Sequence, residues 1–175
     1  MIRIWCVNTD THIRTLEGPN DHSGAVGFIA FSQDSTLVAS ASNDKMLIWR
    51  VNAGEYTQIL ESPEGPSGAV STIAFSHDST LVVSGSTNGI VQIWCVDMGK
   101  CKQSVTGHSS WITSAAFSCD SILMTSASNG KMMRICSVGD RRMQGGNQRW
   151  HYNRCFVICS RYYAFTDYSR HFYYT

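Results

Sequence analysis

Short apolar runs alternate along this chain with polar turns rich in Asn, Asp, Ser and Gly. Residues 25–31, 37–42, 69–75 and 81–86 are made largely of β-branched, aromatic and small residues, and residues 91–96 alternate Val, Ile and Val with Gln, Trp and Cys. Successive side chains of a strand point to opposite faces, so these runs predict β-strands. No stretch keeps a helical period. The pattern therefore predicts an all-β chain of short antiparallel strands.

One sequence pattern occurs three times at a nearly constant spacing. Each copy contains Ala-Phe-Ser-x-Asp-Ser, then Ser-x-Ser, then a run that closes with Ile-Trp or, in the last copy, with Ile-Cys. The repeat is marked by Phe31, Phe75 and Phe117 (44 and 42 residues apart) and by Trp5, Trp49, Trp94 and Cys136 (44, 45 and 42 apart). A period of this length is typical of four-stranded propeller blades.

These residues resemble the WD-repeat family over roughly residues 1–140. The marks are Gly107-His108 opening a unit, Ala-Phe-Ser-x-Asp in its middle, Ser-x-Ser before the inner turn, and Ile-Trp closing the third strand. The phrase Phe-Ser-x-Asp-Ser-Thr-Leu-Val is most similar to repeats of fungal NACHT-type signalling and incompatibility proteins. The resemblance implies a β-propeller built from four-stranded blades.

The repeat boundaries predict the order of units along the chain. The predicted units are residues 1–16 (the outer strands of an incomplete blade), 22–64, 65–106, 107–140 (degenerate at its end) and a non-repeat tail, 141–175. Propellers of this kind close with about four to eight blades. We therefore expect an open, partial propeller of three full blades plus a leading half blade, a fragment of a larger one. Open blade faces also make self-association possible.

The family resemblance implies a buried hydrogen-bonded set in each blade, made of His, Ser, Asp and Trp. Buried imidazole and indole N–H groups need partners, and such a set supplies them. The first full unit holds every member: His22, Ser40 or Ser42, Asp44 and Trp49. This unit is also one residue short before Trp49, which predicts a bulge or slip there.

The other two units depart from the set. The second has Pro66 in the His position and Asn88 in the Asp position. The third keeps His108 and Ser126 but has Gly130 and Cys136 in the Asp and Trp positions. Because each lost buried hydrogen bond costs about 1 kcal/mol, these blades are expected to be less stable.

The composition separates the repeats from the tail. The net charge of +1 gives no field that favours nucleic acid or a membrane. Residues 137–175, however, carry 6 Arg, 2 Asp and 10 of the 19 aromatic residues. Arg interleaved with aromatics suits weak nucleic-acid binding, but no strand pattern organises the tail. A frameshift or splice junction, or a partner-binding extension, would give the same composition.

Seven cysteines and the absence of a signal peptide indicate free thiols and a cytoplasmic, intracellular location. Cys155 and Cys159 with His151 form the only metal-like grouping, and their spacing does not match a zinc ribbon. We therefore expect no metal and no cofactor. We also expect no membrane insertion, because no apolar run is long enough.

Nothing in the sequence indicates an enzyme. Asp34, Asp78 and Asp120 recur at equivalent turn positions, where turn hydrogen bonding explains them. A catalytic site is normally singular, and no phosphate loop, nucleophile elbow or metalloprotease motif is present.

The expected function is that of a noncatalytic scaffold or adaptor that binds a protein or peptide. Trp111 stands where the other units have Ala25 and Ala69, so it is either a partner-binding anchor or a residue packed on the neighbouring blade. The family resemblance favours a sensing arm of a fungal-type signalling protein. The alternative is an adaptor of mitochondrial fission complexes, which would place the chain on the mitochondrial outer surface. The sequence does not name the partner.

Overall fold

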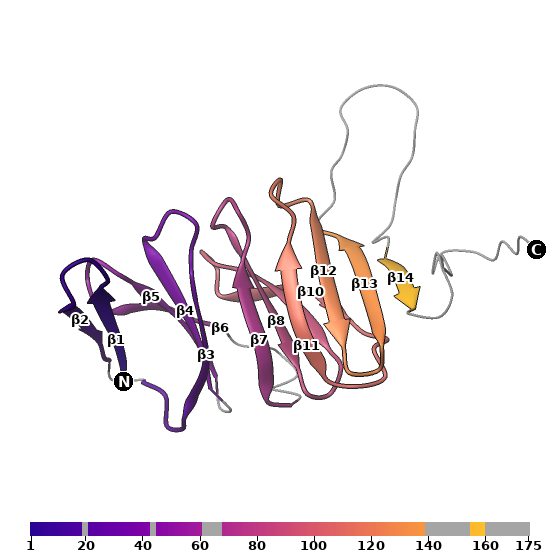
Figure 1. Ribbon diagram of the computed structural model, residues 1–175, viewed down its shortest axis with the longest axis horizontal. Helices are drawn as coiled ribbons and strands as arrows, with labels where there is room; N and C mark the ends of the chain where they lie inside the picture. Colours follow the sequence, from indigo (N-terminus) through magenta and orange to yellow (C-terminus); the bar gives the residue numbers. More distant parts are fainter. Residues whose placement is uncertain (19–20, 43–44, 61–67, 139–154, 160–175) are drawn as a thin grey trace, which may run out of the picture.

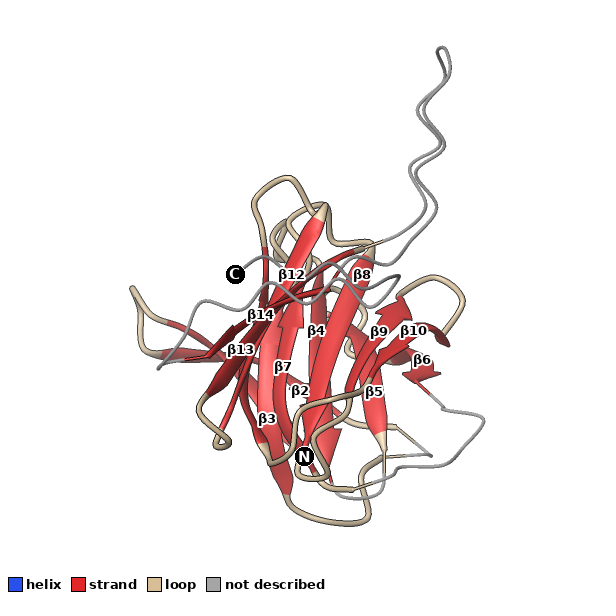
Figure 2. Ribbon diagram, turned by 90° about the vertical axis from the view of Figure 1, so that its right-hand side faces the viewer, coloured by secondary structure: helices blue, strands red, loops and turns tan. Residues whose placement is uncertain are grey.

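The computed structural model describes residues 1–18, 21–42, 45–60, 68–138 and, for the backbone, 155–159. Fourteen strands and no helix form in these residues (Figure 2). No described segment is a helix with the length and apolarity needed to span a membrane.

The strands form four antiparallel sheets, taken in chain order. The half-blade pairs β1 (Ile2–Cys6) with β2 (Thr11–Leu16). Blade 1 contains β3 (Val26–Phe31), β4 (Leu37–Ser42), β5 (Met46–Arg50) and β6 (Tyr56–Leu60). Blade 2 contains β7 (Val70–Phe75), β8 (Leu81–Ser86), β9 (Val91–Cys95) and β10 (Lys100–Val105). Blade 3 contains β11 (Ile112–Phe117), β12 (Leu123–Ser128), β13 (Met132–Ser137) and β14 (Cys155–Cys159).

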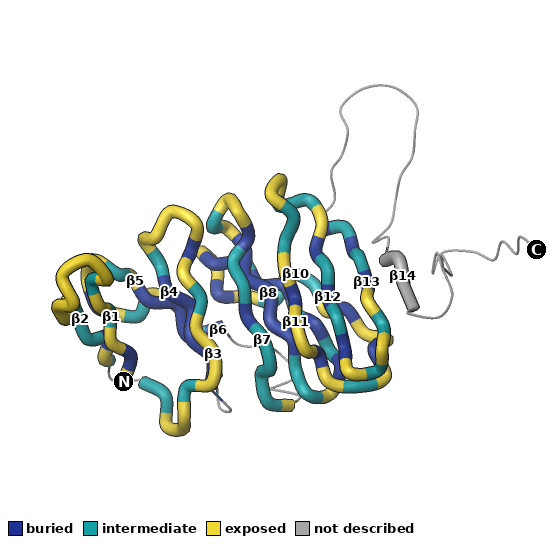
Figure 3. The backbone as a smooth tube through the Cα atoms, in the orientation of Figure 1, coloured by how far each residue is buried: buried dark blue, intermediate teal, exposed yellow. Residues whose placement is uncertain are grey.

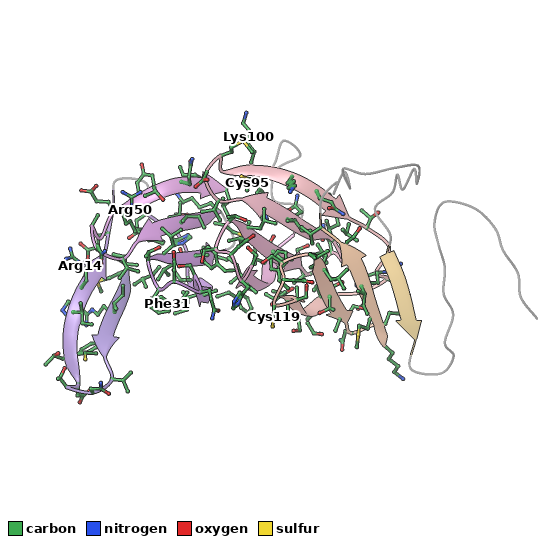
Figure 4. The ribbon with its side chains drawn as sticks, turned by 90° about the horizontal axis from the view of Figure 1, so that it is seen from above. Arg14, Phe31, Arg50, Cys95, Lys100 and Cys119 are labelled. Carbon is green, nitrogen blue, oxygen red and sulfur yellow. The ribbon has the colours of Figure 1, made fainter. Side chains whose placement is uncertain are left out.

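The sheets stand side by side and form an arc (Figure 1). The first strands of neighbouring blades are adjacent, with β3 beside β7 and β7 beside β11. Seen from above, Arg14 and Lys100 lie on the outer side of the arc, and Phe31 and Cys119 on the inner side (Figure 4). The predicted open propeller with three four-stranded blades and a leading half-blade is confirmed.

The hydrophobic core is divided among the interfaces between sheets. One cluster joins the half-blade to blade 1 through Ile2, Leu16, Val38 and Trp49. Corresponding clusters join blade 1 to blade 2 and blade 2 to blade 3. The middle strands β4, β5 and β8 are the most buried (Figure 3), because they are covered on both faces. Each blade is therefore stabilised mainly by its neighbours.

The turn between the first two strands of blade 1 explains its recurring aspartate. Ser32 Oγ donates to Asp34 Oδ1 at 2.6 Å, and the Thr36 amide donates to the same oxygen at 3.1 Å. The Leu37 amide donates to Ser32 Oγ at 2.9 Å. The hydrogen bonds to the carboxylate, the one from Ser32 first and then the one from the Thr36 amide, hold the pKa of Asp34 below its ordinary value.

The same turn is built in blades 2 and 3. Ser76 Oγ donates to Asp78 Oδ1 at 2.6 Å, and Ser118 Oγ donates to Asp120 Oδ1 at 2.5 Å. Burial alone would raise the pKa of Asp78, yet hydrogen bonds from Ser76 and Thr80 lower it overall. The three aspartates are thus parts of repeated turns.

The shortening of the first unit lies in a hairpin loop. The Ser42 amide bonds to the Lys45 carbonyl, whereas the equivalent Ser86 amide reaches one residue further, to Ile90. The β4–β5 ladder runs without a register shift. The β5–β6 ladder does have a register shift between Ile48 and Trp49, where the bulge or slip was predicted. The shift between β5 and β6 has counterparts in the half-blade and in blade 2, so it belongs to the repeat.

The prediction that no strand pattern organises the tail was wrong for residues 155–159. These residues form β14, which pairs antiparallel with β13 and completes the fourth sheet. The connection between β13 and β14 is long, so the fourth strand of blade 3 does not occur at the repeat spacing. Its pairing with the edge of β13 nevertheless puts it in the fourth position of the sheet.

Among the described cysteines, Cys6, Cys95, Cys101 and Cys119 are free, as expected. Cys136 is disulfide-bonded, so the prediction that it is a free thiol was wrong. The β13–β14 pairing places the backbone of Cys155 directly opposite Cys136. The predicted grouping of Cys155, Cys159 and His151 lies outside the described side chains.

Candidate interaction surfaces and the buried polar sets

Blade 1 joins three of the predicted residues through one serine. Trp49 Nε1 donates to Ser40 Oγ at 2.7 Å, and His22 Nε2 lies 2.7 Å from the same oxygen. Ser40 and Trp49 are fully buried, so this hydroxyl satisfies the indole where water cannot reach. Ser42 is also buried, and its hydroxyl has no hydrogen-bond partner in the described part of the chain. Asp44 lies outside the described residues.

Blade 2 keeps the serine and the tryptophan. Trp94 Nε1 donates to Ser84 Oγ at 2.9 Å. Asn88, in the Asp position, accepts hydrogen bonds from the Ser86 hydroxyl and, at 3.0 Å, from the Ile90 amide. Pro66 lies outside the described residues. The side-chain oxygen of Asn88 therefore stabilises the β8–β9 hairpin turn of its own blade.

Blade 3 keeps the histidine and the serine, with His108 Nε2 2.8 Å from Ser126 Oγ. Gly130 has no side chain to play the part of Asn88, and the Ser128 hydroxyl is buried without a partner among the described residues. Cys136 is buried in the tryptophan position. The structure thus brings His22, Ser40 and Trp49 together in blade 1 and His108 and Ser126 together in blade 3, while their structural role stays a prediction.

Arg134 in blade 3 is a buried charge that the sequence analysis missed. Its Nη1 donates to the Thr106 carbonyl at 3.1 Å and its Nη2 to the Gly107 carbonyl at 2.6 Å. Burial, and then the charge of Arg134, lower the pKa of His108 to about 4. His108 is therefore neutral at pH 7, which suits a buried imidazole. The signal in the sequence was an arginine where blades 1 and 2 have Leu47 and Gln92.

Trp111 lies at the surface, in the loop that leads into β11. Its side chain is 61% exposed, so most of the indole is open to solvent. Its carbonyl accepts a hydrogen bond from the Asn129 amide at 2.9 Å, which ties this loop to the β12–β13 hairpin. The backbone under the exposed indole is therefore held in place.

Further exposed apolar side chains lie on the half-blade and on the first strand of blade 1. Trp5, Ile29 and Phe31 are exposed, although their positions in the repeat correspond to buried or packed residues elsewhere. Their exposure is not visible in the sequence, where Trp5 and Phe31 mark the repeat and Ile29 occupies an ordinary core position. No group of three potential metal ligands occurs within the described residues.

The stacked four-stranded antiparallel sheets define an open propeller made of repeats. The family model described as WD domain, G-beta repeat matches residues 10–50, 55–95 and 99–137. This chain belongs to the WD40 repeat family. Each matched segment begins near the last strand of one sheet and runs through the first three strands of the next.

Solved structures support the fold. The chain is similar to "Structure of U3-55K" and to "Crystal structure of RRP9 WD40 repeats", in each case with a TM-score of 0.65 and 23% identity. Each match covers 71% of this chain and 38% of the other, so this chain spans well under half of those structures. No curated protein matches the sequence. Folds of this family typically serve as noncatalytic scaffolds for protein interaction.

Proposed function

We propose that this chain is a noncatalytic scaffold that binds a protein or peptide partner, with Trp111 as an anchor. The observation that carries this proposal is a large indole, 61% exposed, on a loop tied by its backbone to the neighbouring hairpin. A rigid, exposed aromatic side chain loses little conformational entropy on binding and buries a large area.

Selection of displayed peptides on the full chain tests the proposal. Selected peptides are measured against the wild type, Trp111→Ala and Met98→Ala, a matched variant of another exposed apolar side chain. We expect Trp111→Ala to weaken binding at least about 10-fold, as for an interface anchor, and Met98→Ala to leave it unchanged. Equal binding to all three proteins would contradict the anchor role.

The finer assignments rest on the resemblance of the repeats. A sensing arm of a fungal-type signalling protein is the favoured parent, and an adaptor of mitochondrial fission complexes is the alternative. The first assignment implies a cytoplasmic location and the second the mitochondrial outer surface. Fluorescent tagging of the chain in fungal cells distinguishes the two locations.

We propose two further activities, which involve parts of the chain other than Trp111 and its loop. Self-association through the open ends of the arc predicts a concentration-dependent sedimentation coefficient. Nucleic-acid binding through residues 141–175 predicts salt-sensitive affinity for an oligonucleotide. Deletion of residues 141–175 should abolish that affinity; binding that survives the deletion would exclude the tail as its source.

A further inference from the structure

The disulfide at Cys136 has a partner that can be identified by elimination. Cys136 is disulfide-bonded, and the chain has seven cysteines. Four of the others are free, namely Cys6, Cys95, Cys101 and Cys119. The cysteines that remain are Cys155 and Cys159, the first and last residues of β14. The cross-link therefore joins β13 to β14.

The strand register selects Cys155 as the partner. It lies opposite Cys136 in the β13–β14 ladder, whereas Cys159 lies opposite Met132. Directly opposite residues of an antiparallel pair have Cα atoms about 4.5–5.5 Å apart, which is within the span of a disulfide. Cys159 is displaced from this position by four residues, or about 13 Å along the strand, which a disulfide does not bridge.

The equivalent position joins the third and fourth strands of the other blades by side-chain packing. In blade 1, Trp49 lies opposite Tyr56, and their rings meet edge-on with centroids 6.1 Å apart. In blade 2, Trp94 lies opposite Cys101, which packs against the same core cluster. In blade 3 this position holds Cys136, which is 0% exposed in the core between blades 2 and 3. The disulfide thus makes a connection that an indole makes elsewhere.

The strand β14 depends on this cross-link more than its counterparts depend on their contacts. It is five residues long, lies at the edge of its sheet (Figure 1) and, in the described part of the chain, pairs only with β13. Residues 138–154 connect it to β13, whereas residues 51–55 and 96–99 make the same connection in blades 1 and 2. Closing a longer loop costs more conformational entropy, and a disulfide across that loop offsets more of it.

We propose that the disulfide between Cys136 and Cys155 is a redox switch that controls the attachment of β14 to blade 3. In the oxidised form the cross-link holds β14 on β13, and in the reduced form β14 separates from β13. A dithiol reductant opens the bond by exchange, in which one thiolate attacks a sulfur and the second thiol displaces the mixed disulfide. Two electrons and two protons pass to the cysteines, and the dithiol becomes a disulfide.

The rest of blade 3 does not need the cross-link. All six residues of β13 are paired with β12. Ile112 and Met124, from β11 and β12, are buried in the same core cluster as Cys136. A reduced Cys136 remains a small apolar side chain in that cluster. Reduction should therefore release β14 and leave β11, β12 and β13 in place, independently of Trp111.

Peptide mapping without reductant tests the pairing. The full chain is oxidised with a low-molecular-weight disulfide and digested with trypsin and chymotrypsin. Cleavage after Phe156 places Cys155 and Cys159 on different peptides, so mass spectrometry distinguishes them. We expect Cys136 to be linked to Cys155. A link from Cys136 to Cys159, or a free Cys136 after oxidation, would overturn the proposal.

Amide hydrogen exchange tests the switch. Dithiothreitol should speed exchange by about 10-fold or more at the amides of residues 132–137 that face β14, because their ladder partners leave. Exchange in β12 and β8 should not change. Removal of dithiothreitol and addition of the low-molecular-weight disulfide should restore the protection of residues 132–137.

Matched variants in β14 assign the effect. Cys155→Ser should exchange rapidly at residues 132–137 with and without dithiothreitol, whereas Cys159→Ser, in the same strand, should respond as the wild type does. Equal exchange in the oxidised and reduced wild type would contradict the switch. Loss of protection throughout β11, β12 and β13 on reduction would also overturn it, because the cross-link would then hold the whole blade together.

Discussion

Ser40 and Ser84 occupy equivalent positions in blades 1 and 2. Among the described residues, however, their hydroxyl groups form hydrogen bonds with different numbers of side chains. Ser40 links the indole of Trp49 with the imidazole of His22, while the described partner of Ser84 is the indole of Trp94. The repeat predicts both serines from their spacing. The difference between them arises from residues before the first strand, where the units diverge.

The first prediction concerns these serines. Ser40→Ala should lower the free energy of unfolding by about 2–3 kcal/mol, because the buried indole of Trp49 and the half-buried imidazole of His22 both lose this hydroxyl, and Ser84→Ala by about 1 kcal/mol. Urea unfolding followed by tryptophan fluorescence measures both. The exposed Ser114→Ala serves as a control and should change little; equal losses for Ser40→Ala and Ser84→Ala would contradict the linking role.

The second prediction concerns pH. The pKa of His108 falls from its ordinary value of 6.5 to about 4 in the folded chain, because burial and the charge of Arg134 disfavour the imidazolium. Between these values the unfolded chain binds more protons than the folded chain, so stability rises with pH. The free energy of unfolding should therefore fall as the pH drops from about 6.5 towards 4.

His108→Gln isolates this contribution, since glutamine keeps a polar group but does not titrate. The loss of stability between pH 7 and pH 5 should be smaller in the variant than in the wild type. Titration of the His108 ring by NMR gives the pKa directly. A ring that titrates with an ordinary pKa would show that Arg134 and burial do not act on it as described.

At the scale of elements, the turn between the first two strands of each blade repeats its geometry closely. Ser35, Ser79 and Ser121 have positive φ values of 60°, 61° and 57°, which place non-glycine residues in the left-handed region. Each turn is held by a serine–aspartate pair, so the strain is fixed by neighbouring hydrogen bonds. Ser121 differs, because its Oγ accepts a bond from the Asp78 amide of blade 2 at 3.2 Å.

The third prediction follows from this difference. Ser79→Gly should raise the free energy of unfolding by about 0.5 kcal/mol, because glycine adopts a positive φ without a Cβ clash. Ser121→Gly should gain the same backbone relief but lose the bond to blade 2, so its net effect should be zero or destabilising. Thermal unfolding of the two variants side by side checks this; a larger gain for Ser121→Gly would contradict it.

The strand boundaries show which strands the hydrophobic pattern predicts. Strands β4 and β8 lie where the runs 37–42 and 81–86 predicted them, because alternating apolar side chains must face a core. Strand β14 was missed, although Cys-Phe-Val-Ile-Cys is itself a strand-like run. Its place depends on the free edge of β13, which is a neighbour in space and not in the repeat.

At the scale of the whole molecule, side-chain volumes are matched across the interfaces between blades. A Cβ on Gly85 would lie 2.4 Å from Ile112 Cγ2 of the next blade. The equivalent positions between blades 1 and 2 hold Ala41 and Val70, in one shared core cluster. A larger residue in one blade is thus paired with a smaller one in its neighbour.

The fourth prediction is a double-mutant cycle across that interface. Gly85→Ala should destabilise the chain by about 1–3 kcal/mol, because the added methyl overlaps Ile112. Combining it with Ile112→Ala, which removes the overlapping Cγ2, should cost less than the sum of the two single losses. Chemical unfolding of the wild type, both single variants and the double variant gives the coupling energy. Strictly additive losses would mean that the two side chains do not share the space.

The sequence by itself determined the all-β class, the blade repeat, most of the strands and the serine–aspartate turns. It could do so because these features depend on local alternation and on spacing along the chain. Only the tertiary structure decided which apolar residues are covered. Ile29 and Ile73 occupy the same repeat position, but one is exposed and the other buried, since burial depends on the preceding sheet. The disulfide at Cys136 and the buried charge of Arg134 beside His108 likewise depend on neighbours that the repeat does not encode.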